Sequence, residues 1–324
     1  MHMADALLST PVALAGAGIA AVLLGVAGYQ IKKNPDKVNP AMMGVMGAFV
    51  FAAQMVNFSI PGTGSSGHIV GGVLLASLLG PWAAFLTLAS VLVIQCLAFA
   101  DGGLMALGCN IVNMGAMTTL VAYPLIFRPL LRFPAKPWKI IAVSSLACVV
   151  GLELGALCVV GETELSGITA LPVIDFLLLM LPIHLAIGIG EGIATGFVLY
   201  FVQKARPAML THEEGPNEKV STKKMIWGFA ISAAIVGTVL AAIASSDPDG
   251  LEWSIQSLTG STELTTANTV AAGAQSVQKA TSFMPDYDNS LSGIVGGVIV
   301  LGLLWGLTSL LTMRKKTVKV PVRK

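Results

Sequence analysis

Residues 172–203, PVIDFLLLMLPIHLAIGIGEGIATGFVLYFVQ, decide the fold class of this chain. The stretch is apolar with few interruptions, among them Asp175, His184 and Glu191. An α-helix rises ~1.5 Å per residue, so about 20 apolar residues cross the ~30 Å hydrocarbon core of a membrane. The strands of a membrane barrel are only half as long. We therefore expect a transmembrane helix here.

The composition of the whole chain agrees with this stretch. Of its 324 residues, 55% are hydrophobic and only 11% are charged, and the mean hydropathy is +0.80. These values predict an all-α integral membrane protein whose main solvent is lipid. The Lys and Arg residues form short clusters between apolar runs, and the net charge is only +2. Nucleic acid is therefore not an expected partner.

Similar apolar runs recur along the sequence and predict about nine crossings. The runs lie near residues 11–31, 40–58, 68–80, 82–100, 103–127, 138–160, 172–203, 225–245 and 291–312. The run at 68–80 is too short to span alone, so neighbouring helices must shield it or it must be partly re-entrant.

Orientation follows from the positive charges. Lys and Arg cluster near residues 32–37, 128–139, 204–224 and 314–324, and these clusters alternate correctly with nine spans. The opposite loops, near 60–67, 161–167 and 246–290, carry few positive charges. The positive-inside rule places the N-terminus outside and the C-terminus in the cytoplasm of a bacterial-type cell membrane.

A change in composition divides the chain into two modules. Residues 206–224, RPAMLTHEEGPNEKVSTKK, are polar and predict a cytoplasmic linker. A seven-helix module, residues 1–205, precedes the linker and has enough helices to enclose a site. A two-helix module, residues 225–324, follows it and carries an outer loop at 246–290. Two helices are too few for a core of their own, so we expect the second module to lean on the first.

Motifs for enzymatic chemistry are missing from the sequence. It contains no G-x-x-x-x-G-K-[ST] phosphate loop, no G-x-S-x-G elbow and no H-E-x-x-H pair. We expect neither an enzyme nor a bound cofactor, and ATP-driven transport would require another polypeptide. The four cysteines show no C-x-x-C spacing and are expected to be free thiols. The N-terminus lacks a signal-peptide pattern, so Met1 is the expected mature first residue.

The chain has four histidines, and two of them suit roles other than metal capture. His212 lies in the polar linker and is expected to be solvated. His184 precedes Glu191 by seven residues, so both share one helix face and can form a buried hydrogen-bonded pair. That pair supports an alternative function, a self-sufficient secondary metal carrier or channel. A membrane enzyme that uses metal for hydrolysis is a third hypothesis, weakened by the lack of a recognisable base.

His2 directly follows the amino terminus, which brings three nitrogens together on one short chain. The Met1 amine, the His2 backbone amide and the His2 Nδ1 close two fused chelate rings around one metal ion. With the amide deprotonated these donors are coplanar, and an imidazole from elsewhere completes a square that favours Ni(II) or Cu(II) and also accepts low-spin Co(II).

His68 is the candidate fourth donor. It follows SIPGTGSSG on the same outer side as Met1 and begins an apolar run. We expect it at a helix N-terminus, where the partial positive charge keeps the imidazole neutral but also disfavours a cation. Asp5 and Asp101 are carboxylates that can offset that charge. The alternative is a frayed His2 and a His68 that only caps or packs.

The sequence also resembles a known family. The segments MHMADALLS, PGTGSSGHIVGG and FADGGLMALGCNIVNMG are similar to the membrane substrate-binding component of nickel/cobalt energy-coupling factor (ECF) transporters. This likeness covers about the first two hundred residues. The last hundred, with PDGLEWSI at 248–255, resemble the small accessory membrane subunit of the same system, here fused behind the first module.

The resemblance implies a function and a ligand set. The substrate is Ni²⁺ or Co²⁺, held in a plane by donors that match Met1, His2 and His68. It also implies cytoplasmic partners, namely a pair of ATPase subunits and a transmembrane coupling (T) component. The chain departs from the family pattern at Ala6, where a glycine usually follows the early aspartate, and this puts the loop geometry there in doubt.

Overall fold

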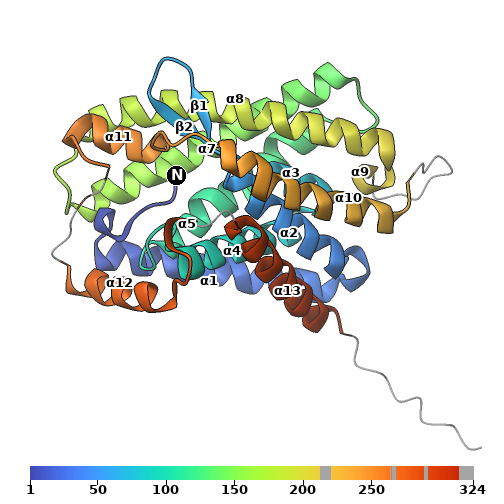
Figure 1. Ribbon diagram of the computed structural model, residues 1–324, viewed down its shortest axis with the longest axis horizontal. Helices are drawn as coiled ribbons and strands as arrows, with labels where there is room; N and C mark the ends of the chain where they lie inside the picture. Colours follow the sequence, from blue (N-terminus) through green and yellow to red (C-terminus); the bar gives the residue numbers. More distant parts are fainter. Residues whose placement is uncertain (212–219, 263, 265–267, 288–290, 314–324) are drawn as a thin grey trace, which may run out of the picture.

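The computed structural model describes residues 1–211, 220–262, 264, 268–287 and 291–313. Helices dominate the described part of the chain, where a single short hairpin interrupts them (Figure 1). The helices are η1 Asp5–Leu7, α1 Thr10–Lys33, η2 Pro35–Lys37, α2 Pro40–Gln54, α3 Gly72–Leu79, α4 Pro81–Phe99, α5 Leu107–Asn110, η3 Ile111–Phe127, α6 Arg128–Leu130, α7 Pro137–Ser166, α8 Val173–Ala205, α9 Ala208–Thr211, α10 Thr222–Ile235, η4 Val236–Leu240, η5 Ala241–Ile243, α11 Gly250–Thr259, α12 Thr269–Thr281, η6 Pro285–Tyr287 and α13 Ser292–Thr312. The hairpin strands are β1 Phe58–Ile60 and β2 Ser65–Gly67.

Seven helices in the described part of the chain are long and apolar enough to cross a membrane. They are Thr10–Lys33, Pro81–Phe99, Leu107–Leu130, Pro137–Ser166, Val173–Ala205, Thr222–Ile243 and Ser292–Thr312. The all-α, multi-pass class is thus confirmed, but two of the about nine expected crossings, one of them already judged too short to span alone, are not full-length spans in the described part of the chain. The runs at 40–58 and 68–80 form α2, with 15 residues, and α3, with 8. The hairpin occupies the chain between these two helices and leaves too few residues for either to span alone.

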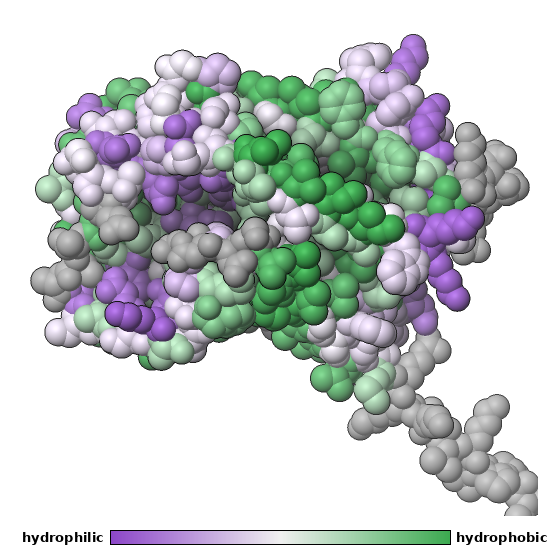
Figure 2. All heavy atoms as spheres, in the orientation of Figure 1, coloured by the Kyte–Doolittle hydropathy of each residue, from purple (hydrophilic) through white to green (hydrophobic). Residues whose placement is uncertain are grey.

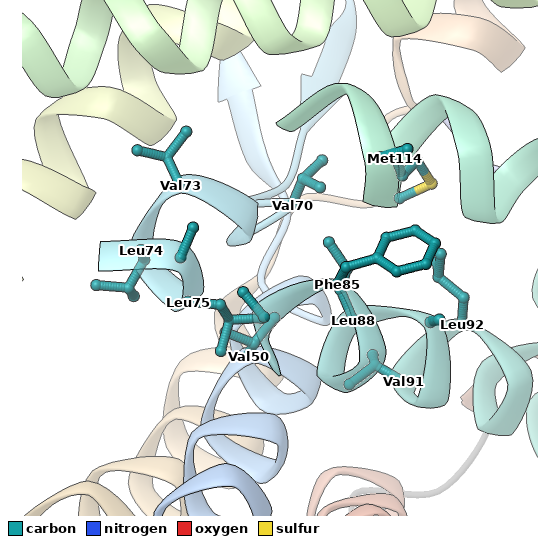
Figure 3. Close-up of a cluster of buried hydrophobic side chains, with 14 of the residues drawn as sticks. Val50, Val70, Val73, Leu74, Leu75, Phe85, Leu88, Val91, Leu92 and Met114 are labelled. Atoms are coloured by element: carbon teal, nitrogen blue, oxygen red, sulfur yellow. The ribbon is translucent and has the colours of Figure 1, made fainter. Parts of the chain in front are cut away.

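The short helix α3 lies inside the protein, as its length required. Its residues from Gly72 to Leu78 are buried. Figure 3 shows Val73, Leu74 and Leu75 in one cluster with Val50 of α2 and with side chains of α4. Glycines with positive φ bound the helix, Gly71 at 81° and Gly80 at 80°, and let the chain turn sharply at both ends. Protein rather than lipid therefore surrounds this segment.

Helices α7 and α8 pack closely along their length because glycines on α8 face the backbone of α7. A Cβ at Gly188 would lie 2.8 Å from Cα of Val149, and one at Gly196 would lie 2.7 Å from Cα of Ile141. Gly192 lies between them and approaches Ser145 more closely still. The segment at 161–167, expected to be an outer loop, belongs to α7 as far as Ser166, because its sequence continues the helix without a break until Gly167.

The C-terminal helices pack against the N-terminal part of the chain. Helices α10 and α13 contact α2, and a Cβ at Gly44 would meet the Leu301 carbonyl oxygen at 2.9 Å. The expected loop at 246–290 contains α11 and α12, which lie at the opposite end of the molecule from α9 (Figure 1). Figure 2 shows a hydrophobic middle region between two hydrophilic ends. The side of the membrane that each end faces stays a prediction.

We expect the same substitution at two glycines to shift thermal stability in opposite directions. Gly192→Ala should lower the melting temperature in detergent, because the new methyl group collides with the α7 backbone at Ser145. Gly161→Ala is the control, since a Cβ there meets no atom within 4 Å and alanine stabilises a helix by about 1 kcal/mol relative to glycine. Equal melting temperatures of the two variants would contradict the close α7–α8 contact.

Candidate metal centre

The first residues of the chain are held inside the protein by backbone hydrogen bonds. The Met3 amide donates to Oδ1 of Asn110 at 2.8 Å, and the Met3 carbonyl accepts from Nδ2 of Asn110 at 3.2 Å and from the Gly103 amide at 2.8 Å. Asp5 is buried, and its Oδ1 accepts from the Ala106 amide at 3.0 Å. The segment that follows α4 therefore anchors the terminus, which Figure 1 draws among the helices.

This anchoring brings the predicted donors together. The Met1 amine nitrogen lies 3.5 Å from Nε2 of His68. The His2 and His68 rings are stacked, with centroids 5.5 Å apart and planes inclined by 17°. Adjacent nitrogens of a square-planar site with metal–nitrogen bonds of about 2.0 Å are about 2.9 Å apart. The amine and His68 thus need to approach by about 0.6 Å to share one ion.

A chain of three amide groups orients the ring of His2. The Val70 carbonyl can only accept a hydrogen bond, so Nε2 of Gln54 donates to it at 2.8 Å. Oε1 of Gln54 then accepts from Nε2 of Gln95 at 2.6 Å, and Oε1 of Gln95 accepts from Nε2 of His2 at 3.3 Å. Nε2 of His2 thus faces an acceptor in this chain, and a metal at Nδ1 would leave the contact with Gln95 in place.

The local structure around His68 differs from the one that the sequence predicted. Helix α3 begins at Gly72, so His68 belongs to the extended segment after β2 and not to a helix N-terminus. Its imidazole is kept neutral by other causes. Burial lowers the pKa of His68 to about 3, and the charge of the nearby amine acts in the same direction. Burial also lowers the pKa of His2, which Asp101 opposes. The ring of His68 is therefore in the neutral, metal-binding form at neutral pH.

Two carboxylates contact the donor atoms directly. Asp101 Oδ1 lies 3.1 Å from Nδ1 of His2, and its Oδ2 accepts a hydrogen bond of 2.7 Å from the Tyr287 hydroxyl. The Met1 amine forms an ion pair with Oδ2 of Asp249. Asp101 thus lies beside the donors as expected, whereas Asp5 binds the backbone of the anchoring segment instead.

Sequence reasoning missed Asp249. It begins α11, where its side chain accepts from the Leu251 and Glu252 amides, and the Glu252 side chain accepts from the Asp249 amide. The spacing D-x-x-E within PDGLE predicts such a capping box and therefore a helix start. It gives no indication that the free carboxylate oxygen faces a terminus 248 positions earlier in the chain. Within the described ranges, no group of three or more His, Cys, Asp and Glu side chains is arranged to hold a metal.

Comparison with known proteins gives the family. The family described as the cobalt uptake substrate-specific transmembrane region, CbiM, matches residues 2–209. The chain belongs to this family. Residues 223–313 match a second family, the PDGLE domain, so the chain joins a CbiM region to a PDGLE domain, as the resemblance implied.

Relatives from several organisms share this arrangement or part of it. A NikMN protein of Archaeoglobus fulgidus is 32% identical over 318 residues, which cover 95% of this chain and 98% of the relative. The fused nickel transport protein NikMN of Rhodobacter capsulatus is 28% identical and covers 80% and 77%. The cobalt transport protein CbiM of Sorangium cellulosum is 27% identical and covers 65% and 94%.

Solved structures agree with the family. A crystal structure titled as a truncated transition metal transporter superposes with a TM-score of 0.55 at 32% identity. The match covers 62% of this chain and 98% of that chain. A second one, titled as a transition metal transporter, has the same TM-score at 33% identity and covers 63% and 93%.

The remaining histidines and the cysteines do not extend the donor set. His184 Nδ1 contacts the Met180 carbonyl at 2.7 Å, and its Nε2 has no hydrogen-bond partner among the described residues. Glu191 instead accepts from the Val70 and Gly71 amides, each at 2.9 Å. The predicted hydrogen bond between His184 and Glu191 is therefore wrong. The Glu191 carboxylate accepts hydrogen bonds from two backbone amides of the turn before α3 instead. All four cysteines are free thiols, and His212 lies outside the described residues.

Replacing Glu191 should test its structural role. We expect Glu191→Gln to lower the melting temperature, because its amide offers one acceptor to two buried N–H groups and leaving one unsatisfied costs about 1–3 kcal/mol. Glu164→Gln, at an exposed position near the end of α7, should melt like the wild type. A Glu191→Gln variant that melts normally but fails to transport metal would instead favour an ion relay.

Proposed function

We propose that the chain is the substrate-binding component of an ECF-type ABC transporter for the uptake of Ni²⁺ or Co²⁺. Four nitrogens capture the metal: the Met1 amine, the His2 amide, Nδ1 of His2 and Nε2 of His68. The observation that carries this proposal is the position of the amine, 3.5 Å from His68 Nε2 with the His2 ring stacked against His68. Membership of the CbiM family supports it.

Similarity to relatives favours nickel over cobalt. Four nitrogens in one plane suit Ni(II) or Cu(II) and also accept low-spin Co(II), so the donor set alone does not choose between nickel and cobalt. Two relatives that contain both regions of this chain are the NikMN proteins, one of them described as a fused nickel transport protein. Nickel is accordingly the proposed principal substrate and cobalt the second one.

Metal binding releases protons and brings positive charge into the site. The amine and the His2 amide each lose one proton to the solvent when they bind the metal. A cavity of about 480 Å³ reaches the site and is lined by His2, His68, Asp101 and Asp249. Two carboxylates beside a dication reduce the cost of moving its charge out of water. The deprotonated amide removes a further unit of positive charge.

Transport requires partners under this proposal. A pair of ATPase subunits and a T component would act on residues 1–205 from the cytoplasmic side, where the Lys and Arg clusters and the C-terminus lie according to the positive-inside rule. Residues 206–224 form the cytoplasmic linker to the accessory module at 225–324. The N-terminus then faces the outside, where it meets the incoming metal.

The donor set can be tested by changes at the first residue. We expect one extra residue ahead of Met1 to abolish high-affinity nickel binding, because it converts the amine into a peptide amide and moves the histidine from position 2. One extra residue after Lys324 is the matched control and should bind normally. His2→Ala and His68→Ala should each reduce affinity by more than about 100-fold, beyond the usual loss for residues that only support a ligand.

Isothermal titration of the purified protein with nickel measures these affinities. His212→Ala serves as a further control and should leave the dissociation constant unchanged. Unaltered binding by the N-terminally extended protein would contradict the proposed site.

The affinity for nickel should fall steeply on acidification. Because burial lowers the pKa of His68 to about 3, this imidazole stays neutral between pH 8 and pH 5, and burial lowers the pKa of His2 as well. The dependence then arises from the amine and the amide, and each displaced proton contributes up to about a tenfold loss per pH unit. Titrations between pH 8 and pH 5 measure the slope, and a flat profile would exclude this donor set.

A further inference from the structure

Two residues of the accessory module contact groups at the proposed metal site. Asp249 pairs with the Met1 amine, and Tyr287 donates to the carboxylate of Asp101, which contacts Nδ1 of His2. Both Asp249 and Tyr287 lie in the segment between η5 and α13. Figure 2 shows hydrophilic residues around a hollow at this end of the molecule.

Asp249 is placed by contacts with the segment that carries His68. The Ser66 amide donates to the Pro248 carbonyl at 2.8 Å, and the Ser66 hydroxyl donates to the Asp247 carbonyl at 2.7 Å. The Trp253 indole donates to the Thr63 carbonyl at 3.0 Å. These bonds join the residues around Asp249 to the hairpin β1–β2. Ser66 of this hairpin lies two residues ahead of His68, the proposed fourth donor.

Close packing on α8 fixes the other side of Asp249. A Cβ at Gly250 would lie 3.0 Å from Cδ1 of Ile187 and 3.1 Å from Cε1 of His184. The glycine therefore lets α11 begin against α8, and the capping box orients the Asp249 carboxylate: Oδ1 accepts from the Leu251 and Glu252 amides, while Oδ2 faces the amine. The carboxylate is held rigidly before it meets the terminus.

We propose that Asp249 is a positioning residue of the metal site, which holds the N-terminal amine beside His68 until the metal takes its place. A chain terminus would otherwise fray, and a dangling amine must be ordered at the moment of binding. Ordering it in advance removes that entropic cost. This inference rests on the proposed function for its role in binding, whereas the contact between Met1 and Asp249 is part of the structure.

Acylation of the Met1 amine tests the positioning directly. The metal-free, full-length protein in detergent is treated briefly with a succinimidyl ester near neutral pH, and mass spectrometry of the N-terminal peptide gives the rate. We expect the wild type to react slowly, because the amine is buried and paired. Asp249→Asn and Asp249→Ser should react at least about tenfold faster and should bind nickel about 10- to 100-fold more weakly.

The choice of variants separates positioning from folding. Asn and Ser are both good N-cap residues, so α11 keeps its start. Glu252→Gln is the matched control, because it alters the other half of the capping box without touching the amine, and it should change neither rate nor affinity. Equal acylation of the wild type and both Asp249 variants, or an equal gain in Glu252→Gln, would overturn the inference.

The same experiment distinguishes this inference from the proposed function. Nickel should protect the wild-type amine from acylation if Met1 is a donor. Faster acylation of the Asp249 variants without nickel protection of the wild type would support the positioning contact and refute the donor set. Nickel protection with unchanged acylation of the Asp249 variants would refute the positioning role alone.

Discussion

The burial of a charged N-terminal amine is the constraint on which this structure depends. A cation removed from water is stable only with a counter-ion and hydrogen-bond partners. Asp249 supplies the counter-ion, and the bonds of Asn110 and Gly103 to Met3 keep the terminus in place. The terminus is thereby ordered like a core segment, which is the condition for its backbone nitrogens to act as ligands.

The polar groups around the site form a directed network with one end fixed by the backbone. The Val70 carbonyl sets the direction of the bonds through Gln54 and Gln95 to His2. Glu191 binds the amides of Val70 and Gly71, so the same short segment carries His68, anchors the amide chain and begins α3. This explains why α3 is too short to span and why the protein buries it: its start is held by Glu191 beside His68.

The two family regions of the chain meet at this site and not only through the packing of their helices. Helices α10 and α13 pack on α2, but the residues before α11 bond with the hairpin and reach the amine. In a fused chain the two regions are present in equal numbers. The contact between Asp249 and Met1 therefore forms within one molecule. It avoids the entropic cost of bringing two separate proteins together.

The sequence by itself determined the membrane class and the fusion of two family regions, because these depend on local composition and on motifs. It also predicted the donors Met1, His2 and His68 from adjacent atoms and motifs. The lengths of α2, α3 and α7 were less well predicted. An apolar run shows that a segment is removed from water, but it does not show whether lipid or protein surrounds the segment. Asp249, the partners of Glu191 and the extended setting of His68 were decided by the tertiary structure alone. Each of these features depends on which backbone groups lie unpaired beside a side chain. Only the folded chain brings residues so distant in sequence within hydrogen-bonding distance.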